Sequence, residues 1–268
     1  AWTGGFLTRS TRSPGYPVAL AAAEMLSAGS SWTAPALNLL LDLLNLALVF
    51  LLAGRWYGAH AAGTAAALYA LFGPVFLYLP LATPEILSVT LVLLICLGLA
   101  QLRTHYWRTA PAVAVLFAWL IHTRPVFLLL LPALGLAAWL ELAGSAWRNR
   151  LIRATLLATL ALILCLPWGI RNWRLHQAIV PVCVTAGWHL VNRAQTTADL
   201  SVSFLTDYIY EPAHAKFAEG DYYREGMKLS GKLFRHEPFR VLGNGCLRVI
   251  HGWILPQTPW RWLLPRAY

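Results

Sequence analysis

Long apolar stretches, with charged residues confined mostly to the segments between them, are the feature that most constrains how this chain folds. Five such stretches occupy residues 35–53, 59–79, 85–102, 110–141 and 153–168. About 20 helical residues cross the hydrocarbon core of a bilayer, which is about 30 Å thick. Only 12% of the 268 residues are charged, where a soluble domain of this size carries about a quarter. The sequence therefore predicts an all-α integral membrane protein.

The number of spans depends on residues 110–141, which are too many for one crossing and rather few for two. Arg124 and Pro125 interrupt this stretch, and proline breaks the helical hydrogen-bond ladder. If the stretch is a hairpin, six arginines of the short loops lie on one side, namely Arg55, Arg103, Arg108, Arg148, Arg150 and Arg153. Cytoplasmic loops carry such an excess. We therefore expect about six transmembrane helices, with residues before 35 and after 168 facing away from the cytoplasm.

This topology divides the chain into three parts. Residues 1–34 are interpreted as the end of a first extracytoplasmic loop with an interfacial helix, residues 35–168 as the transmembrane bundle, and residues 169–268 as an extracytoplasmic, mostly helical region. Within the last part, residues 222–235 alternate basic and apolar positions at helical spacing. This pattern predicts an amphipathic helix on a membrane surface or in a small domain.

The formal net charge of +10 raises the question of nucleic-acid binding. The 21 Lys and Arg residues form no patch interleaved with aromatics, however, and fall between apolar runs or in the last hundred residues. That distribution fits membrane topology. The cysteines show no metal-binding spacing. No nucleic-acid partner is expected.

Four positions at the predicted outer side carry candidate chemistry. Residues 12–17 (Arg-Ser-Pro-Gly-Tyr-Pro) predict a turn just before a short helix over residues 18–26. Arg12 and Tyr16 in it suit either a headgroup anchor or a ligand site. Arg124 lies in the outer turn of the hairpin, where it would reach headgroups or a bound phosphate. Arg171 follows the last span, and its planar guanidinium suits a lipid-linked phosphate.

Acidic and amide side chains within the apolar stretches are few. Glu85 follows Pro84 at a helix start, where a carboxylate either complements the helix dipole or serves chemistry. Asn38, Asp42 and Asn45 share one helical face in the middle of a span. Such a stripe usually faces away from lipid and forms hydrogen bonds between helices.

Together these residues resemble membrane glycosyltransferases of the C superfamily, in the branch that contains protein O-mannosyltransferases and bacterial aminoarabinose transferases. The resemblance rests on an ordered set of motifs: R-x-P-G-Y-P at residues 12–17, an acid at Glu85, L-x-R-P loosely at residues 121–125, and P-W-x-x-R-N at residues 167–172. Further elements are V-P at 180–181, G-x-x-L at 187–190, and Glu-Pro-Phe-Arg at 237–240 in place of N-P-x-R.

The resemblance implies a reaction in which an acceptor hydroxyl attacks a polyprenyl-phosphate sugar. Because Arg12, Arg124 and Arg171 come from three separate outer segments, we expect them to bind the donor phosphate around one cavity, with Tyr16 and Asn172 in support. The resemblance makes Glu85 a catalytic candidate. The family's main catalytic Asp precedes the R-x-P-G-Y-P turn. Because no acid occurs before Glu24 and the chain starts with Ala1, we expect that residue upstream of this fragment.

The expected enzyme is a hexosyl- or pentosyltransferase of a bacterial inner membrane, active on the periplasmic or exterior side. Its partners would be a polyprenyl-phosphate-linked sugar, membrane lipid, and a protein or glycolipid acceptor. No cofactor is assigned, although a divalent metal is compatible with this chemistry. Two alternatives remain open: a non-catalytic or degenerate relative, and a transporter whose path is lined by Asn38, Asp42 and Asn45.

Overall fold

The fold is known from a computed structural model, which describes residues 13–73, 76, 78–183, 219–236, 238–239 and 243. Every regular element in this part of the chain is a helix, as the apolar pattern predicts. The chain divides into two units, residues 13–169 and residues 170–268 with 1–12, and each is described here by itself. Arg12, residues 187–190, Glu237 and Arg240 lie outside the described residues.

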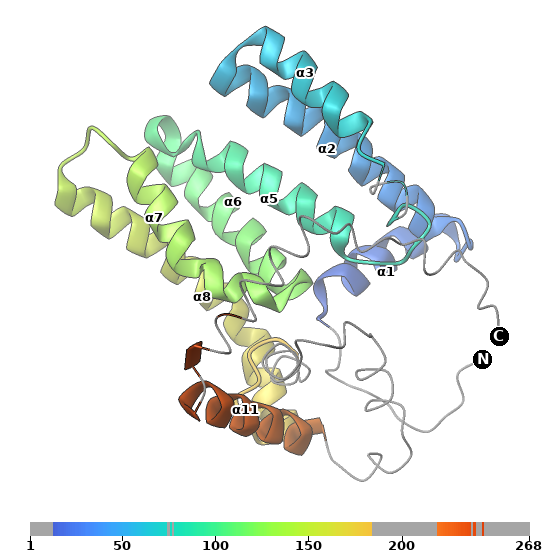
Figure 1. The fold of residues 1–268 in the computed structure, drawn as a ribbon, viewed down its shortest axis with the longest axis vertical. Helices are drawn as coiled ribbons and strands as arrows, with labels where there is room; N and C mark the ends of the chain where they lie inside the picture. Colours follow the sequence, from blue (N-terminus) through green and yellow to red (C-terminus); the bar gives the residue numbers. More distant parts are fainter. Residues whose placement is uncertain are drawn as a thin grey trace. The chain divides into compact units, whose positions relative to one another are not determined.

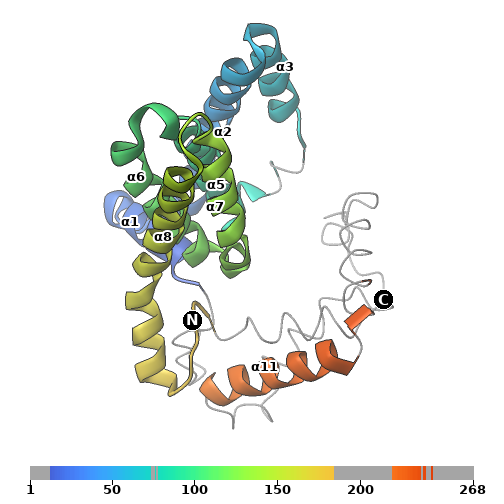
Figure 2. The same cartoon turned by 90° about the vertical axis from the view of Figure 1, so that its left-hand side faces the viewer.

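The first unit begins with a short helix and a helical hairpin. Helix α1 covers Gly15–Ser27, α2 covers Thr33–Tyr57 and α3 covers Ala59–Ala70. Gly58 alone separates α2 from α3, with a φ of 90° that side chains rarely tolerate. This turn brings α2 and α3 side by side (Figure 1). Figure 2 shows the same hairpin from a direction turned by 90°.

The other helices of this unit follow in pairs. Helix α5 covers Glu85–Leu99 and packs on both α2 and α6, which covers Leu102–Thr123. A 3-10 segment, Pro125–Leu130, leads into α7, Leu131–Glu141. Helix α8 then runs over Trp147–His176, and its residues from Ile170 belong to the second unit.

The predicted break within residues 110–141 is confirmed. Helix α6 ends at Thr123, Arg124 has an extended backbone (φ −139°, ψ 104°), and the next element starts at Pro125. The ring of Pro125 disfavours a helical conformation at the preceding residue, which explains the position of the break. An α6–α7 pair therefore replaces one long helix.

Several boundaries differ from those expected. Helix α1 begins at Gly15, inside the motif, because Pro17 then occupies a first turn in which its missing N–H needs no acceptor. Helix α3 ends at Ala70, well short of residue 79, since Gly73 and Pro74 follow. Helix α8 is 30 residues long and contains Pro167 within it.

Two helices of the described chain, α2 and α8, are long and apolar enough to cross a membrane. The segments Glu85–Leu99 and Pro125–Glu141 are apolar but shorter, and the expected count of six spans is not confirmed. Asn38 and Asn45 are fully buried, and both donate to backbone carbonyls outside their own helix. Asp42 accepts from the hydroxyl of Tyr69 on α3 at 2.7 Å. The polar stripe is thus interhelical, as predicted.

The second unit contains helix α11, Glu219–His236, which confirms the helix predicted over residues 222–235. Tyr223 of α11 forms a small buried cluster with Ala178 and Val180. Arg224 donates to the carbonyl oxygen of Gln177 at 3.3 Å. These contacts attach α11 to the segment that follows α8.

We expect Asn38→Ala to lower the free energy of unfolding by about 1–3 kcal/mol, because buried carbonyls lose their donor. Unfolding by SDS in mixed micelles measures the change. The control is Leu39→Ala, at the neighbouring half-exposed position of α2. If the two variants unfold at the same SDS fraction, the hydrogen bonds of Asn38 do not stabilise the fold.

Candidate functional site

An ion pair joins the start of α5 to the end of α6. The Nη2 of Arg124 contacts the Oε1 of Glu85. Glu85 is the first residue of α5, and Arg124 directly follows the last residue of α6. These helices are packed neighbours, so the pair marks one end of the bundle.

The role of this ion pair follows from its exposure. The side chains of Arg124 and Glu85 are 39% and 31% exposed. Ion pairs at this exposure stabilise a fold by only about 0–1 kcal/mol, because water screens the charges. The pair therefore does little to hold the bundle together. Its consequence is geometric: Glu85 orients the guanidinium of Arg124 and leaves its other nitrogens for a second anion.

Asn38 holds the residues that lead up to Glu85. Its Nδ2 donates to the carbonyl oxygens of Tyr78, Leu79 and Leu81 at 3.3, 3.1 and 2.7 Å. Since Asn38 is fully buried in α2, these bonds fix the approach of the chain to α5. The position of Glu85 therefore depends on an asparagine 47 residues earlier in the sequence.

Tyr16 extends this network to α1. Its hydroxyl donates to the Oδ1 of Asn38 at 3.3 Å, and its ring is 5% exposed. Burial raises the pKa of Tyr16, and the negative charge of Glu85 adds to the increase. The phenol is therefore neutral at physiological pH and available as a donor. The predicted site residues Tyr16, Glu85 and Arg124 are thus brought together.

The Pro-Gly-Tyr turn packs directly on the end of α6. A Cβ placed on Gly15 would lie 2.6 Å from the backbone nitrogen of Thr123, a distance that no side chain can occupy. The indole Nε1 of Trp119 donates to the carbonyl oxygen of Gly15 at 3.1 Å. Glycine at position 15 is therefore required by close approach of the two backbones.

His122 and Trp168 complete the site. Their rings meet edge to face, with centroids 6.2 Å apart. Trp168 belongs to the P-W-x-x-R-N motif of α8, so a fourth motif reaches the same end of the first unit. His122 was not predicted as a site residue. The available signal was a histidine inside an apolar stretch, two residues before Arg124.

Three buried polar atoms at this end have no hydrogen-bond partner among the described residues. They are the Oγ1 of Thr83, the Oε2 of Glu85 and the Nδ1 of His122. Buried polar groups are normally satisfied, so unpaired ones are where a bound molecule or water would supply the partner. All three atoms can accept a hydrogen bond. The site therefore suits a ligand that carries hydroxyl donors.

Arg171 and Asn172 lie in the second unit, in the last part of α8. The Nη1 of Arg171 donates to the Oδ1 of Asn172 at 2.9 Å. Asn172 is fully buried, and its Nδ2 donates to the carbonyl oxygens of Val180 and Val182, both at 3.1 Å. These hydrogen bonds explain the spacing between the R-N and V-P motifs, because the amide of Asn172 holds the residues around the V-P motif in place after α8 ends. Asn172 also orients the guanidinium of Arg171.

The remaining predictions for the site stay untested. The position of Arg12 is outside the described part of the chain, so a cavity shared by Arg12, Arg124 and Arg171 remains a prediction. Among the described residues, no group of three or more His, Cys, Asp or Glu side chains is arranged to hold a metal ion.

These features define a class: a helical membrane protein with an ion-paired, hydrogen-bonding site at one end of its bundle. The model of one family, described as dolichyl-phosphate-mannose-protein mannosyltransferase, matches residues 11–170, which is more than half of the chain. The chain belongs to this family. No curated protein and no solved structure matches it. The membership confirms the resemblance seen in the motifs and identifies the chain as a mannosyltransferase-like membrane glycosyltransferase.

We expect Gly15→Ala to destabilise the protein by about 1–3 kcal/mol, because the end of α6 must move to admit a methyl group. The matched control is Gly63→Ala in α3, where no atom lies within 4 Å and alanine favours the helix. Unfolding in SDS mixed micelles compares the two variants. Equal or greater stability of Gly15→Ala would show that the turn does not pack against Thr123.

Proposed function

We propose that this chain transfers a sugar from a polyprenyl-phosphate donor to an acceptor hydroxyl on the extracytoplasmic side of the membrane. The observation that carries the proposal is the oriented Arg124, held by Glu85 beside three unpaired hydrogen-bond acceptors. An arginine suits the donor's phosphate, and the acceptors suit the hydroxyls of its sugar. The family's description, which contains dolichyl-phosphate-mannose, names a donor of this chemical class.

In the proposed reaction, the oxygen of the acceptor hydroxyl attacks the anomeric carbon of the donor sugar. The bond between that carbon and the phosphate oxygen breaks, and its electron pair leaves with the polyprenyl phosphate. A carboxylate base takes the proton of the hydroxyl. Arginine groups stabilise the charge that develops on the departing phosphate.

We assign the phosphate to Arg124 and Arg171, together with Arg12. Support for Arg171 comes from the P-W-x-x-R-N motif and from its hydrogen bond to the buried Asn172, which limits the directions its guanidinium can take. Glu85 stays the catalytic candidate among the described residues: it orients Arg124, and its Oε2, which has no partner among the described residues, accepts a hydroxyl of the substrate. Tyr16 and Asn172 act in support by fixing the segments that carry these groups.

The alternative of a transporter is not favoured by the polar residues of α2. Asn38, Asp42 and Asn45 each hydrogen-bond to another element of the protein. The Oδ1 of Asn45 has no partner among the described residues, but one such atom does not make a polar path. A non-catalytic relative remains the competing hypothesis, and the activity assay below separates the two.

The proposed reaction side requires the six-span topology. We expect a cysteine at His105 to be labelled only from the cytoplasmic side and one at Gln195 only from the opposite side. A membrane-impermeant maleimide, applied to intact cells and to inverted vesicles that express the full protein, measures this. Labelling of both cysteines from the same side would contradict the topology and leave the family assignment unaffected.

We expect Arg124→Lys and Arg171→Lys each to lower kcat/KM. The ammonium group of lysine cannot reproduce the two parallel hydrogen bonds that a planar guanidinium donates to a phosphate. The loss of transition-state stabilisation should be about 2–4 kcal/mol, or roughly 30- to 1000-fold in rate. The assay uses the full protein in membranes with a polyprenyl-phosphate sugar, normalised to folded protein. Arg108→Lys and Arg174→Lys, both at exposed positions, are the matched controls.

Three results would decide among the remaining hypotheses. Wild-type turnover in Arg171→Lys and Arg124→Lys would reduce both residues to headgroup anchors. Absence of turnover in the wild-type protein with every polyprenyl-phosphate sugar would favour the non-catalytic relative. If Glu85→Gln lowers kcat/KM only as far as Arg124→Lys does, and the double variant no further, Glu85 acts only by orienting Arg124 and its proposed contact with the substrate is wrong.

A further inference from the structure

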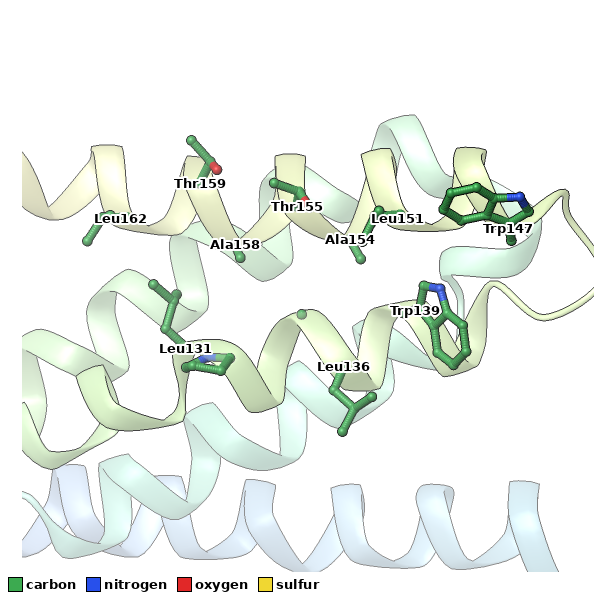
Figure 3. A pocket seen from close by; sticks show the side chains of 12 residues that line it. Leu131, Leu136, Trp139, Trp147, Leu151, Ala154, Thr155, Ala158, Thr159 and Leu162 are labelled. Carbon is green, nitrogen blue, oxygen red and sulfur yellow. The ribbon is translucent and has the colours of Figure 1, made fainter.

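A groove of about 700 Å³ runs between α7 and α8 (Figure 3). Leu131, Leu136, Leu151 and Leu162 line its walls, and the Ala158 methyl lies 3.9 Å from where a Cβ on Gly135 would be. Gly135 and Ala158 let the two helices approach each other at this point. The volume is in the range of small-molecule sites, and the lining suits hydrocarbon.

One end of this groove is aromatic and basic. Trp139 and Trp147 come from opposite walls and lie at the end nearest the α7–α8 connection (Figure 3). The guanidinium of Arg150 stacks 3.8 Å from the Trp139 ring centroid, and its Nε and Nη2 donate to the Trp139 carbonyl oxygen at 3.0 and 2.8 Å. Amphipathic aromatics beside arginines are typical of headgroup depth in a membrane.

The charge around this end is mostly positive. Arg148 is exposed next to Trp147, and Arg103 reaches the same connection, with its Nη2 3.5 Å from where a Cβ on Gly144 would be. Glu141 is the acidic side chain at the end of α7. Three arginines against one carboxylate leave a net positive field at the aromatic end of an apolar groove. An anionic amphiphile complements this arrangement.

This end is not the end at which the donor phosphate is proposed to bind. Arg124 precedes the 3-10 segment that leads into Leu131, whereas Trp139 lies near the other end of α7. The part of α7 from Leu131 to Trp139 alone contributes about 12 Å to their separation, at 1.5 Å per residue. A headgroup at Trp139 therefore belongs to a molecule other than the sugar donor.

We propose that the groove binds an anionic phospholipid, with its acyl chains along the leucine-lined walls and its phosphate at Arg148 and the remaining nitrogen, Nη1, of Arg150. The proposal rests on the membrane location of the protein and not on the transferase activity. A zwitterionic phospholipid shares the acyl chains and the phosphate, but the positive charge of its choline group is repelled by the arginines, so its net attraction to this end is weaker. A membrane helix of another protein could also fill an apolar groove, but it would not explain the cluster of arginines at one end.

The test is native mass spectrometry of the full protein with added phosphatidylglycerol or phosphatidylcholine. We expect a preference for phosphatidylglycerol that Arg150→Ala lowers about tenfold, because a charge-assisted contact is lost. Arg148→Ala, at an exposed position, should also lower the preference for phosphatidylglycerol. This variant removes a positive charge and leaves the hydrogen bonds between Arg150 and Trp139 in place. Arg108→Ala, which removes the same charge from an exposed site on α6, should leave the preference unchanged.

A second pair of variants tests the apolar part. Gly135→Leu fills the groove and should abolish binding of both lipids, whereas Gly63→Leu, at a helical glycine with open surroundings, should not. Ala158→Leu fills the groove from the opposite wall. If one of the two groove-filling variants does not fold, the other still tests the proposal. Equal binding of the two lipids by wild-type protein, or wild-type binding by a folded groove-filling variant, would overturn the proposal.

Two other occupants are also distinguished. Displacement of phosphatidylglycerol by an equimolar amount of polyprenyl phosphate would assign the groove to the donor lipid and overturn the proposal. A photo-crosslinker at Leu136 that captures another protein segment in place of lipid would overturn it as well.

Discussion

Buried asparagine amides that hydrogen-bond to backbone carbonyls are the interaction on which the rest of this structure depends. In an apolar bundle, non-helical backbone is tolerated only where the protein itself satisfies its polar groups. Asn38 does this for the residues before α5, and Asn172 for the segment after α8. Each amide thereby allows an irregular segment to sit beside a helix end. Both of these segments adjoin the residues proposed to act on the donor.

The sequence predicts the helical class, the break at Arg124 and the interhelical role of the polar stripe, because each follows from local physics. An apolar run, a proline and a helical face need no knowledge of distant residues. The ion pair between Glu85 and Arg124 could not be predicted in this way. Thirty-nine residues separate the partners, and their meeting depends on how α5 packs against α6. The motifs indicated both residues but not that they bind each other.

The missed features have the same origin. His122 is one polar residue in an apolar stretch, and only its contact with Trp168 of α8 distinguishes it from an isolated buried histidine. The end of α3 at Ala70 depends on Gly73 and Pro74, which outweigh the apolar residues that follow. The length of α8 exceeds its apolar core because helices extend through basic residues beyond the hydrocarbon boundary, where the side chains reach water.

The Glu85–Arg124 pair also constrains how a phosphate can bind. A guanidinium already paired with a carboxylate has lost part of its attraction for another anion, so the pair lowers affinity for phosphate in the ground state. It also removes the rotamer freedom that Arg124 would lose on binding, which is up to about 2 kcal/mol for a free arginine. In the proposed reaction, the charge on the departing phosphate grows as the glycosidic bond breaks. An arginine that is already oriented stabilises this growing charge without reorganising, which favours the transition state.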